Sequence, residues 1–228
     1  MVLVGDSGGQ VFAGAESTLH VTLDHMVYHA RAVRRGVKRA LLVVDMPFLT
    51  FQISPEETLR NAGRLMTEGG AEAAKLEGGD EESVRHVAAL VRAGIPVMGH
   101  VGLTPQSVHA LGGYRVQGRD PANAARLRTE AQRLQDAGAF AIVLELVPAA
   151  LAGEITAALE IPTIGIGAGP QVDGQVLVLP DMLGLNEGFR PKFLRTFASL
   201  AEEARRGVTD YVKAVRDGSY PAAEHSFE

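Results

Sequence analysis

Ionisable residues follow or close several short apolar runs in this 228-residue chain, in chain order Asp6, Asp45, Lys75 with Glu77, His100, and Glu145. Carboxylates in a chain without cysteine suit a hard cation such as Mg²⁺. A lysine among them can hold a substrate carboxylate or phosphate as a point charge. A further glutamate in apolar surroundings can have a raised pKa and act as a base. The set therefore predicts metal-assisted removal of a proton beside a carbonyl group, and says less about the substrate.

Each of these residues also has a purely structural explanation. An aspartate after a strand often caps a helix or a turn, a lone histidine is often a hydrogen-bonded core residue, and Lys75 and Glu77 can form an ion pair on one face of a strand. Glu77 and Glu145 are too long to be good caps, however, and buried charges are costly unless they are paired or bind metal. Five successive strands with ionisable ends therefore favour one shared site.

Seven apolar runs must position these residues. They are not alternating but apolar throughout, which is typical of parallel strands covered by helices on both faces. The runs are residues 2–5, 40–44, 73–76, 95–99, 140–144, 162–166 and 175–179. The carboxyl ends of parallel strands lie on one side of an α/β fold, so we expect the ionisable residues to meet there.

Helical stretches with clear ends separate the runs. Ser54 followed by Pro55, and Asp80 followed by two glutamates, predict helix starts. Glycines stand where the helices should end, at Gly36, Gly69, Gly94 and Gly138. Strands alternating with helices indicate an α/β fold with right-handed crossovers.

Seven strand units leave two architectures open. One is an open doubly wound sheet, and the other is a (β/α)₈ barrel whose first unit lies upstream of this start. The last stretch, residues 190–217, is predicted to be helical only, with a break at Gly207. We find no change of composition that would mark a linker, so residues 1–228 are expected to form a single domain.

The composition excludes several classes of protein. Lys plus Arg number 22 and Asp plus Glu 27, so the net charge of −5 argues against a broad nucleic-acid surface. Without cysteine the chain has no disulfide, zinc-thiolate site or cysteine nucleophile. No apolar run approaches the roughly 20 residues of a membrane-spanning helix. The first residues do not form a signal peptide, so we expect a cytoplasmic protein without membrane or nucleic-acid partners.

Nine motifs along the chain resemble, in order, those of the ketopantoate hydroxymethyltransferase family. They are VGDS (4–7), DMPF (45–48), KLEGG (75–79), GHVGLTPQS (99–107), GGYRVQGR (112–119), LELVP (144–148), IGIGAG (164–169), DGQVLV (173–178) and EHSF (224–227). The resemblance implies a (β/α)₈ TIM barrel of the phosphoenolpyruvate/pyruvate superfamily that uses Mg²⁺.

The resemblance also implies the reaction. Such an enzyme transfers a one-carbon unit from 5,10-methylenetetrahydrofolate to the 2-oxo acid 3-methyl-2-oxobutanoate and forms 2-dehydropantoate. This is the first committed step of pantothenate and coenzyme A synthesis. The resemblance further implies that this chain forms a homo-oligomer, as members of the family typically form decamers.

The motifs assign a role to each candidate residue. Asp6 and Asp45 would be Mg²⁺ ligands in contact with the substrate, and Glu77 would be a further ligand, directly or through water. The other four roles concern the keto acid: Ser7 and Lys75 would bind its carboxylate, Glu145 would take the proton from its branched carbon, and His100 would line the site and hydrogen-bond substrate or loop.

The chain departs from the family at its start, where members carry an amino-terminal helix, the first strand and its helix before VGDS. We expect either a start placed at an internal methionine or a truncation, which would leave the barrel with two open edges. Gly8 also stands where the family has a larger residue.

Two alternatives to a hydroxymethyltransferase therefore remain. The chain could be another Mg²⁺-dependent 2-oxo acid enolate enzyme of the superfamily, such as a carbon–carbon lyase, although the 112–119 and 224–227 motifs argue against this. It could also be an inactive fragment that retains only binding or assembly.

Overall fold

The computed structural model describes residues 1–227. The chain forms two compact units, Met1–Val176 and Leu177–Glu228. All the strands and every candidate site residue belong to the first unit. The single domain expected over residues 1–228 stays a prediction.

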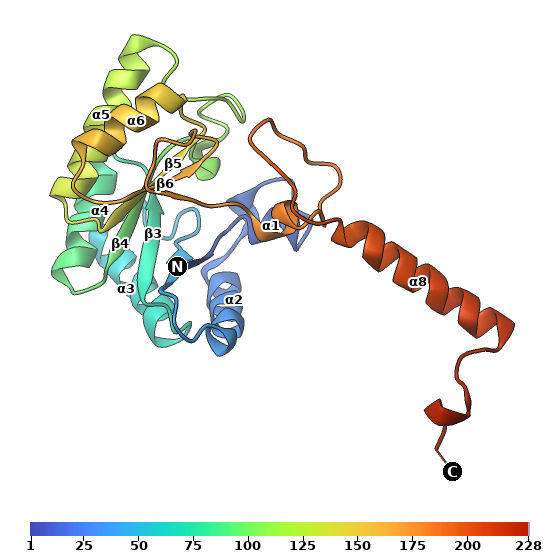
Figure 1. Ribbon diagram of the computed structural model, residues 1–228. Coiled ribbons are helices and arrows are strands. Elements are labelled where there is room, and N and C mark those ends of the chain that lie inside the picture. The colour runs from blue at the N-terminus through green and yellow to red at the C-terminus, as the bar shows by residue number, and fades with distance from the viewer. Residues whose placement is uncertain (228) are drawn as a thin grey trace. The chain divides into compact units, whose positions relative to one another are not determined.

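One parallel sheet runs through the first unit, with its seven strands in chain order from β1 to β7. The sheet is curled, as Figure 1 shows, and within residues 1–227 β1 and β7 each pair with a strand on one side only. The strands are β1 Val2–Val4, β2 Leu42–Asp45, β3 Ala73–Glu77, β4 Val97–Gly102, β5 Ala141–Glu145, β6 Thr163–Ile166 and β7 Gly174–Gln175.

The first six predicted strands are confirmed, but the seventh is largely wrong. Only Gly174–Gln175 pair with β6 as a strand; Val176 still donates to the carbonyl of Gly165, and Leu177 and Val178 belong to no strand. The short helix α7, Leu179–Met182, begins where the predicted strand should end, and Pro180 stands in its first turn. The fixed backbone of proline suits a helix start, which accounts for where α7 begins.

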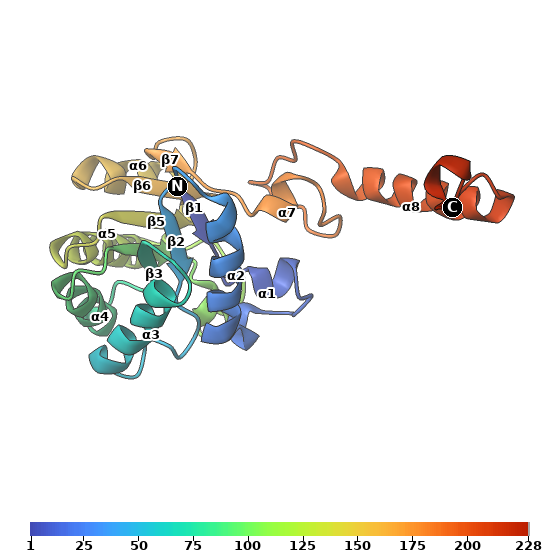
Figure 2. The same ribbon diagram turned by 90° about the horizontal axis from the view of Figure 1, so that it is seen from below.

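Helices follow the strands and cover the outer face of the curled sheet, an arrangement that Figures 1 and 2 show from two sides. They are α2 Leu23–Gly36, α3 Pro55–Thr67, α4 Glu81–Arg92, α5 Pro121–Asp136 and α6 Ala149–Ala158. The short helix α1, Gly8–Val11, packs instead on the 3₁₀ turn η1, Thr18–His20, and a second 3₁₀ turn, η2, spans Pro105–Ser107. The predicted caps are confirmed: Ser54 accepts a hydrogen bond from the backbone of Glu57, and Asp80 accepts from those of Glu82 and Ser83.

The two faces of each strand contribute to different clusters, because successive side chains point to opposite sides. In β2, Leu42 and Val44 belong to the large core under the helices, whereas Val43 belongs to a smaller cluster inside the curl. Ala73, Met98, Ala141 and Val143 share this smaller cluster. Side chains two or four positions later on the same strands also point to the inside of the curled sheet, and these include the candidate site residues.

The second unit contains α7, the helix α8 (Leu200–Asp217) and the 3₁₀ turn η3 (Ala223–His225). The helix predicted from residue 190 is therefore wrong for residues 190–199, where the backbone bonds elsewhere: the amide of Phe197 donates to the carbonyl of Met182. The break predicted at Gly207 is absent, because α8 runs through it. A glycine inside an exposed helix costs only about 1 kcal/mol.

In the part of the chain that the structure describes, no helix has the length and apolar character needed to cross a bilayer.

A substitution at Gly102, the last residue of β4, tests the close packing between the ends of β4 and β5. The φ of Gly102 is +100°, and a Cβ atom there would lie 2.2 Å from the carbonyl oxygen of Glu145. Gly94 is a matched control, since its φ is +84° but a Cβ would meet nothing within 4 Å. We expect Gly94→Ala to lower the free energy of unfolding by about 1 kcal/mol from backbone strain alone. Gly102→Ala should cost ~2 kcal/mol more through the clash. Equal urea midpoints for the two variants would contradict this account.

Candidate functional site

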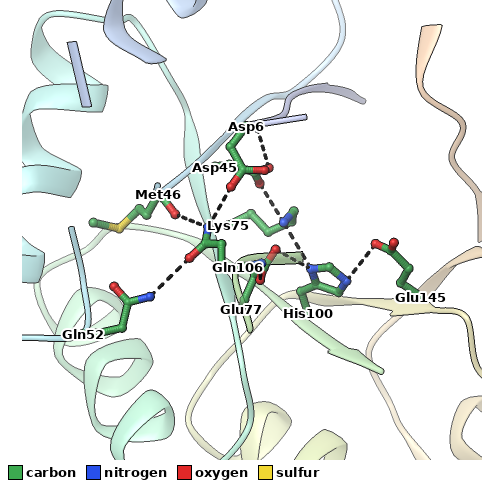
Figure 3. A network of polar contacts seen from close by, with 9 residues as sticks. All are labelled: Asp6, Asp45, Met46, Gln52, Lys75, Glu77, His100, Gln106 and Glu145. Atoms are coloured by element: carbon green, nitrogen blue, oxygen red, sulfur yellow. Dashed lines mark hydrogen bonds and ion pairs between the residues drawn. The ribbon is translucent and has the colours of Figure 1, made fainter. Parts of the chain in front are cut away.

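Six candidate residues lie in one network at the carboxyl ends of the strands, as the sequence predicts. Asp6 follows β1, Asp45 ends β2, and Glu145 ends β5. The other three point into the curl from β3 and β4. Figure 3 shows the joined set of Asp6, Asp45, Lys75, Glu77, His100 and Glu145.

Lys75 and Asp45 form a buried ion pair across β2 and β3. The distance between Lys75 Nζ and Asp45 Oδ1 is 2.8 Å, and each side chain is 5% exposed. The other oxygen, Asp45 Oδ2, accepts a hydrogen bond from the backbone N–H of Asp6 at 3.1 Å. Burial opposes the charged form of Lys75, but Asp45, Glu77 and Asp6 outweigh it and raise the lysine's pKa above its usual value.

His100 lies between two glutamates. Its Nδ1 is 3.5 Å from Glu77 Oε1, and its Nε2 is 3.3 Å from Glu145 Oε2. Burial and the charge of Lys75 oppose protonation, yet the two glutamates raise the pKa of His100 to about 9. Lys75 Nζ lies 3.4 Å from His100 Nδ1, so the ammonium group and the imidazole ring are direct neighbours in the network.

Negative charge is in excess in this network, and Asp6 shows it. Four carboxylates face only Lys75 and His100. Burial, followed by repulsion from Asp45 and Glu77, raises the pKa of Asp6 to about 7, although Lys75 and a hydrogen bond from Gln106 act in the opposite direction. A raised pKa of this kind shows that the acids carry more negative charge than the neighbouring cations neutralise, so the site can accept a further positive charge.

Gln106 is the residue of the network that the sequence analysis missed. It lies in η2, just after β4, and is buried. Its side-chain amide donates to Asp6 Oδ2 and to the carbonyl of Met46, both at 2.9 Å, and its backbone N–H donates to Glu77 Oε2 at 3.0 Å. The motif at 99–107 contains it, but an uncharged side chain beyond the strand end gave no chemical signal.

Ser7 stands apart from the network. It is the N-cap of α1, but its side chain makes no capping hydrogen bond. A Cβ atom placed on Gly5 would lie 2.9 Å from Ser7 Oγ and 3.4 Å from Asp45 Oδ2, so both side chains flank Gly5. The hydroxyl is thus near the carboxylates but not bonded to them.

Glu145 is the most accessible acid of the strand ends, with 19% of its side chain exposed against 5% for Asp45 and Glu77. The backbone on both sides of it is held: Leu103 donates to its carbonyl at 2.8 Å, and Leu146 donates to that of Ile166 at 2.9 Å. Leu146 has a φ of +47°, a conformation that non-glycine residues adopt at a cost. This turn fixes the backbone from which the side chain of Glu145 extends.

The donor set fits a magnesium ion. In the described part of the chain, Asp45 Oδ1 is buried without a hydrogen bond and is engaged only by the ion pair with Lys75. No three metal-ligating side chains already form a cluster within residues 1–227. Mg²⁺ does not need one, because proteins usually hold it through one or two carboxylates together with substrate oxygens and water.

The family profile described as ketopantoate hydroxymethyltransferase matches residues 1–223. The 3-methyl-2-oxobutanoate hydroxymethyltransferase of Syntrophotalea carbinolica is 55% identical over 227 residues, which are 100% of this chain and 85% of that protein. The protein of the same name from Oleidesulfovibrio alaskensis is 56% identical over 227 residues, covering 100% of this chain and 78% of its own.

Solved structures show the same fold at low sequence identity. A 2,3-dimethylmalate lyase of the PEP mutase/isocitrate lyase superfamily has a TM-score of 0.54 at 16% identity, over 97% of this chain and 76% of its own. A putative phosphonomutase from Burkholderia cenocepacia has a TM-score of 0.53 at 15% identity, over 85% and 78%. With the curled seven-stranded parallel sheet, these confirm the expected barrel-type α/β fold.

The raised pKa of Asp6 predicts how the stability of the metal-free protein depends on pH. An aspartate is ordinarily protonated only below about pH 3.9. Between that value and its folded-state pKa of about 7, the folded state binds more protons, so this group makes stability fall as pH rises. We expect Asp6→Asn to remove the decrease in the free energy of unfolding that Asp6 causes as pH rises from roughly 4 to 7. Urea unfolding in EDTA across that range measures it, and equal slopes for both proteins would contradict the prediction.

Proposed function

The chain belongs to the ketopantoate hydroxymethyltransferase family, and we propose that it forms 2-dehydropantoate from 3-methyl-2-oxobutanoate and 5,10-methylenetetrahydrofolate. In this reaction a carbon–carbon bond forms between the branched carbon of the keto acid and the one-carbon unit of the folate. The bonds from that unit to folate nitrogen break, and water supplies the oxygen of the new hydroxyl group. The observation that carries the proposal is the buried network of four carboxylates around Lys75 and His100.

Binding of the keto acid needs positive charge, which the chain supplies through Lys75. Its ammonium group would attract the substrate carboxylate, and the hydroxyl of Ser7, beside Gly5, would donate a hydrogen bond to it. Asp6 and Asp45 would hold Mg²⁺, and Glu77 would hold it directly or through water. When bound, the ion would act as a Lewis acid on the keto group. The excess of negative charge around Asp6 supports this assignment.

Glu145 is the proposed base. Its side chain is more exposed than those of the other acids at the strand ends, and it lies at the same carboxyl-terminal end of the sheet as Lys75. Its carboxylate would take the proton from the branched carbon beside the keto group, and the resulting carbanion would be delocalised into that group. His100, 3.3 Å from Glu145, would orient the carboxylate, and the turn at Leu146 would fix its backbone.

A purified sample of this 228-residue chain tests the activity directly. With both substrates and Mg²⁺ we expect 2-dehydropantoate, detected by mass spectrometry, and we expect its formation to stop with EDTA and to return with added Mg²⁺. A folded chain that forms no product would contradict the proposal and favour the inactive-fragment alternative. Formation of a carbon–carbon cleavage product from 2-oxo acids would favour the lyase alternative.

Glu145→Gln tests the base separately from binding. We expect this variant to bind the keto acid with Mg²⁺ as the unmodified protein does, but to lose roughly 10²- to 10⁴-fold in the exchange of the branched-carbon proton. Proton NMR in D₂O without folate measures the exchange, and calorimetry measures binding. Glu154→Gln is the matched control, because Glu154 lies on α6 and pairs with Arg128 outside the network. Retained exchange in Glu145→Gln would remove Glu145 as the base.

A further inference from the structure

Gln106 connects more of the proposed metal site than any single acid does. Through its side-chain amide and its backbone N–H it reaches Asp6 after β1, the Met46 carbonyl after β2, and Glu77 in β3. Its side-chain oxygen accepts from Gln52 Nε2 at 3.2 Å, as Figure 3 shows. Four hydrogen bonds at one buried residue therefore tie together the carboxyl ends of three neighbouring strands.

The partners of Gln106 fix the orientation of its amide group. Both groups that its nitrogen contacts, the Asp6 carboxylate and the Met46 carbonyl, have oxygens that accept, so the nitrogen must face them. The oxygen then faces Gln52, which donates. Each polar atom of the side chain is satisfied in only one of the two possible flips. Such a side chain holds its neighbours more firmly than one that can rotate.

These contacts also decide which carboxylate oxygens stay open. Gln106 occupies Asp6 Oδ2 and Glu77 Oε2, and the Asp6 backbone occupies Asp45 Oδ2. Within residues 1–227 the Asp6 carboxylate accepts a hydrogen bond only at Oδ2, and Asp45 Oδ1 is engaged only by its 2.8 Å ion pair with Lys75. One oxygen of each aspartate is thus held by a hydrogen bond from the protein, while a cation can approach the other, which on Asp45 lies beside the lysine.

We propose that Gln106 is a positioning residue that orients the carboxylates of Asp6 and Glu77 for a divalent cation, with Gln52 supporting its amide. The inference rests on the proposed function, because it concerns the same metal site. Hydrogen-bond partners of metal ligands typically contribute 10- to 100-fold to metal affinity. Gln106 would act in this way without touching the ion or the substrate.

Binding of Mn²⁺ as a probe, followed by electron paramagnetic resonance without substrate or folate, tests the proposal. Gln106→Met keeps the volume and the backbone N–H to Glu77 but removes the amide. We expect its Mn²⁺ affinity to fall roughly 10- to 100-fold. The Mg²⁺ concentration for half-maximal turnover should rise in parallel, while kcat at saturating Mg²⁺ changes much less. A loss of kcat with unchanged Mn²⁺ affinity would overturn the proposal.

Gln117→Met is the matched control. Gln117 lies in the same loop and is 6% exposed, against 5% for Gln106. Among residues 1–227 its side chain bonds only to the Arg115 carbonyl and to Asn123, so the same substitution should leave Mn²⁺ affinity unchanged. An equal loss of affinity in both variants would show a general packing effect and overturn the proposal.

Gln52→Met keeps the proposal falsifiable if Gln106→Met does not fold. It removes the donor to Gln106 Oε1 and the long 3.4 Å bond that Gln52 Oε1 accepts from the Phe51 N–H, but no contact to a proposed metal ligand. We therefore expect a smaller loss of Mn²⁺ affinity in the same direction, about threefold. No change would overturn the proposal. If the unmodified protein itself binds no Mn²⁺, both the proposed metal site and this inference fail. If it binds Mn²⁺ and forms product while Gln106→Met binds equally well, only the inference fails.

Discussion

Balance of charge in a buried space is the constraint on which the site depends. Asp45, Lys75, Glu77 and His100 are almost completely withdrawn from solvent, and such charges persist only when opposite charges and hydrogen bonds compensate them. Lys75 and His100 compensate two of the four acids, and the raised pKa of Asp6 reflects what is left over. Uncompensated negative charge would destabilise a network with only a structural role. Here the same charge favours binding of a cation, and the cation together with Lys75 can bind an anionic substrate.

The strand period brings these groups together. Val43, Ala73, Met98 and Val143 fill the inside of the curled sheet, and Asp45, Lys75, His100 and Glu145 follow them by two positions on their own strands. The apolar cluster inside the sheet therefore lies directly next to the charged residues at the carboxyl ends of the strands. A shift of one residue in register would turn a charged side chain towards the helices, where Leu42, Leu76 and Leu144 pack.

The site could be predicted from the sequence where an ionisable residue lies in or directly after an apolar run that forms a strand. Asp45, Lys75, Glu77, His100 and Glu145 lie in or at the end of apolar runs, so their meeting could be predicted from the common direction of parallel strands. Gln106 could not be found in this way, because it is uncharged and its position depends on the path of a 3₁₀ turn. The short β7 and the late start of α8 were missed for a similar reason: apolar content alone does not show which backbone groups find partners outside the element.

The long separation along the chain between partners has a consequence for biosynthesis. Asp6 and Gln106 are 100 positions apart yet hydrogen-bonded, and Glu145 comes later still. During translation, which proceeds from the amino terminus, Asp6 leaves the ribosome well before Gln106, whose amide bonds it, and before Glu145. The nascent chain therefore carries these acids before their partners are made, and the network is complete only after β5 has joined the sheet.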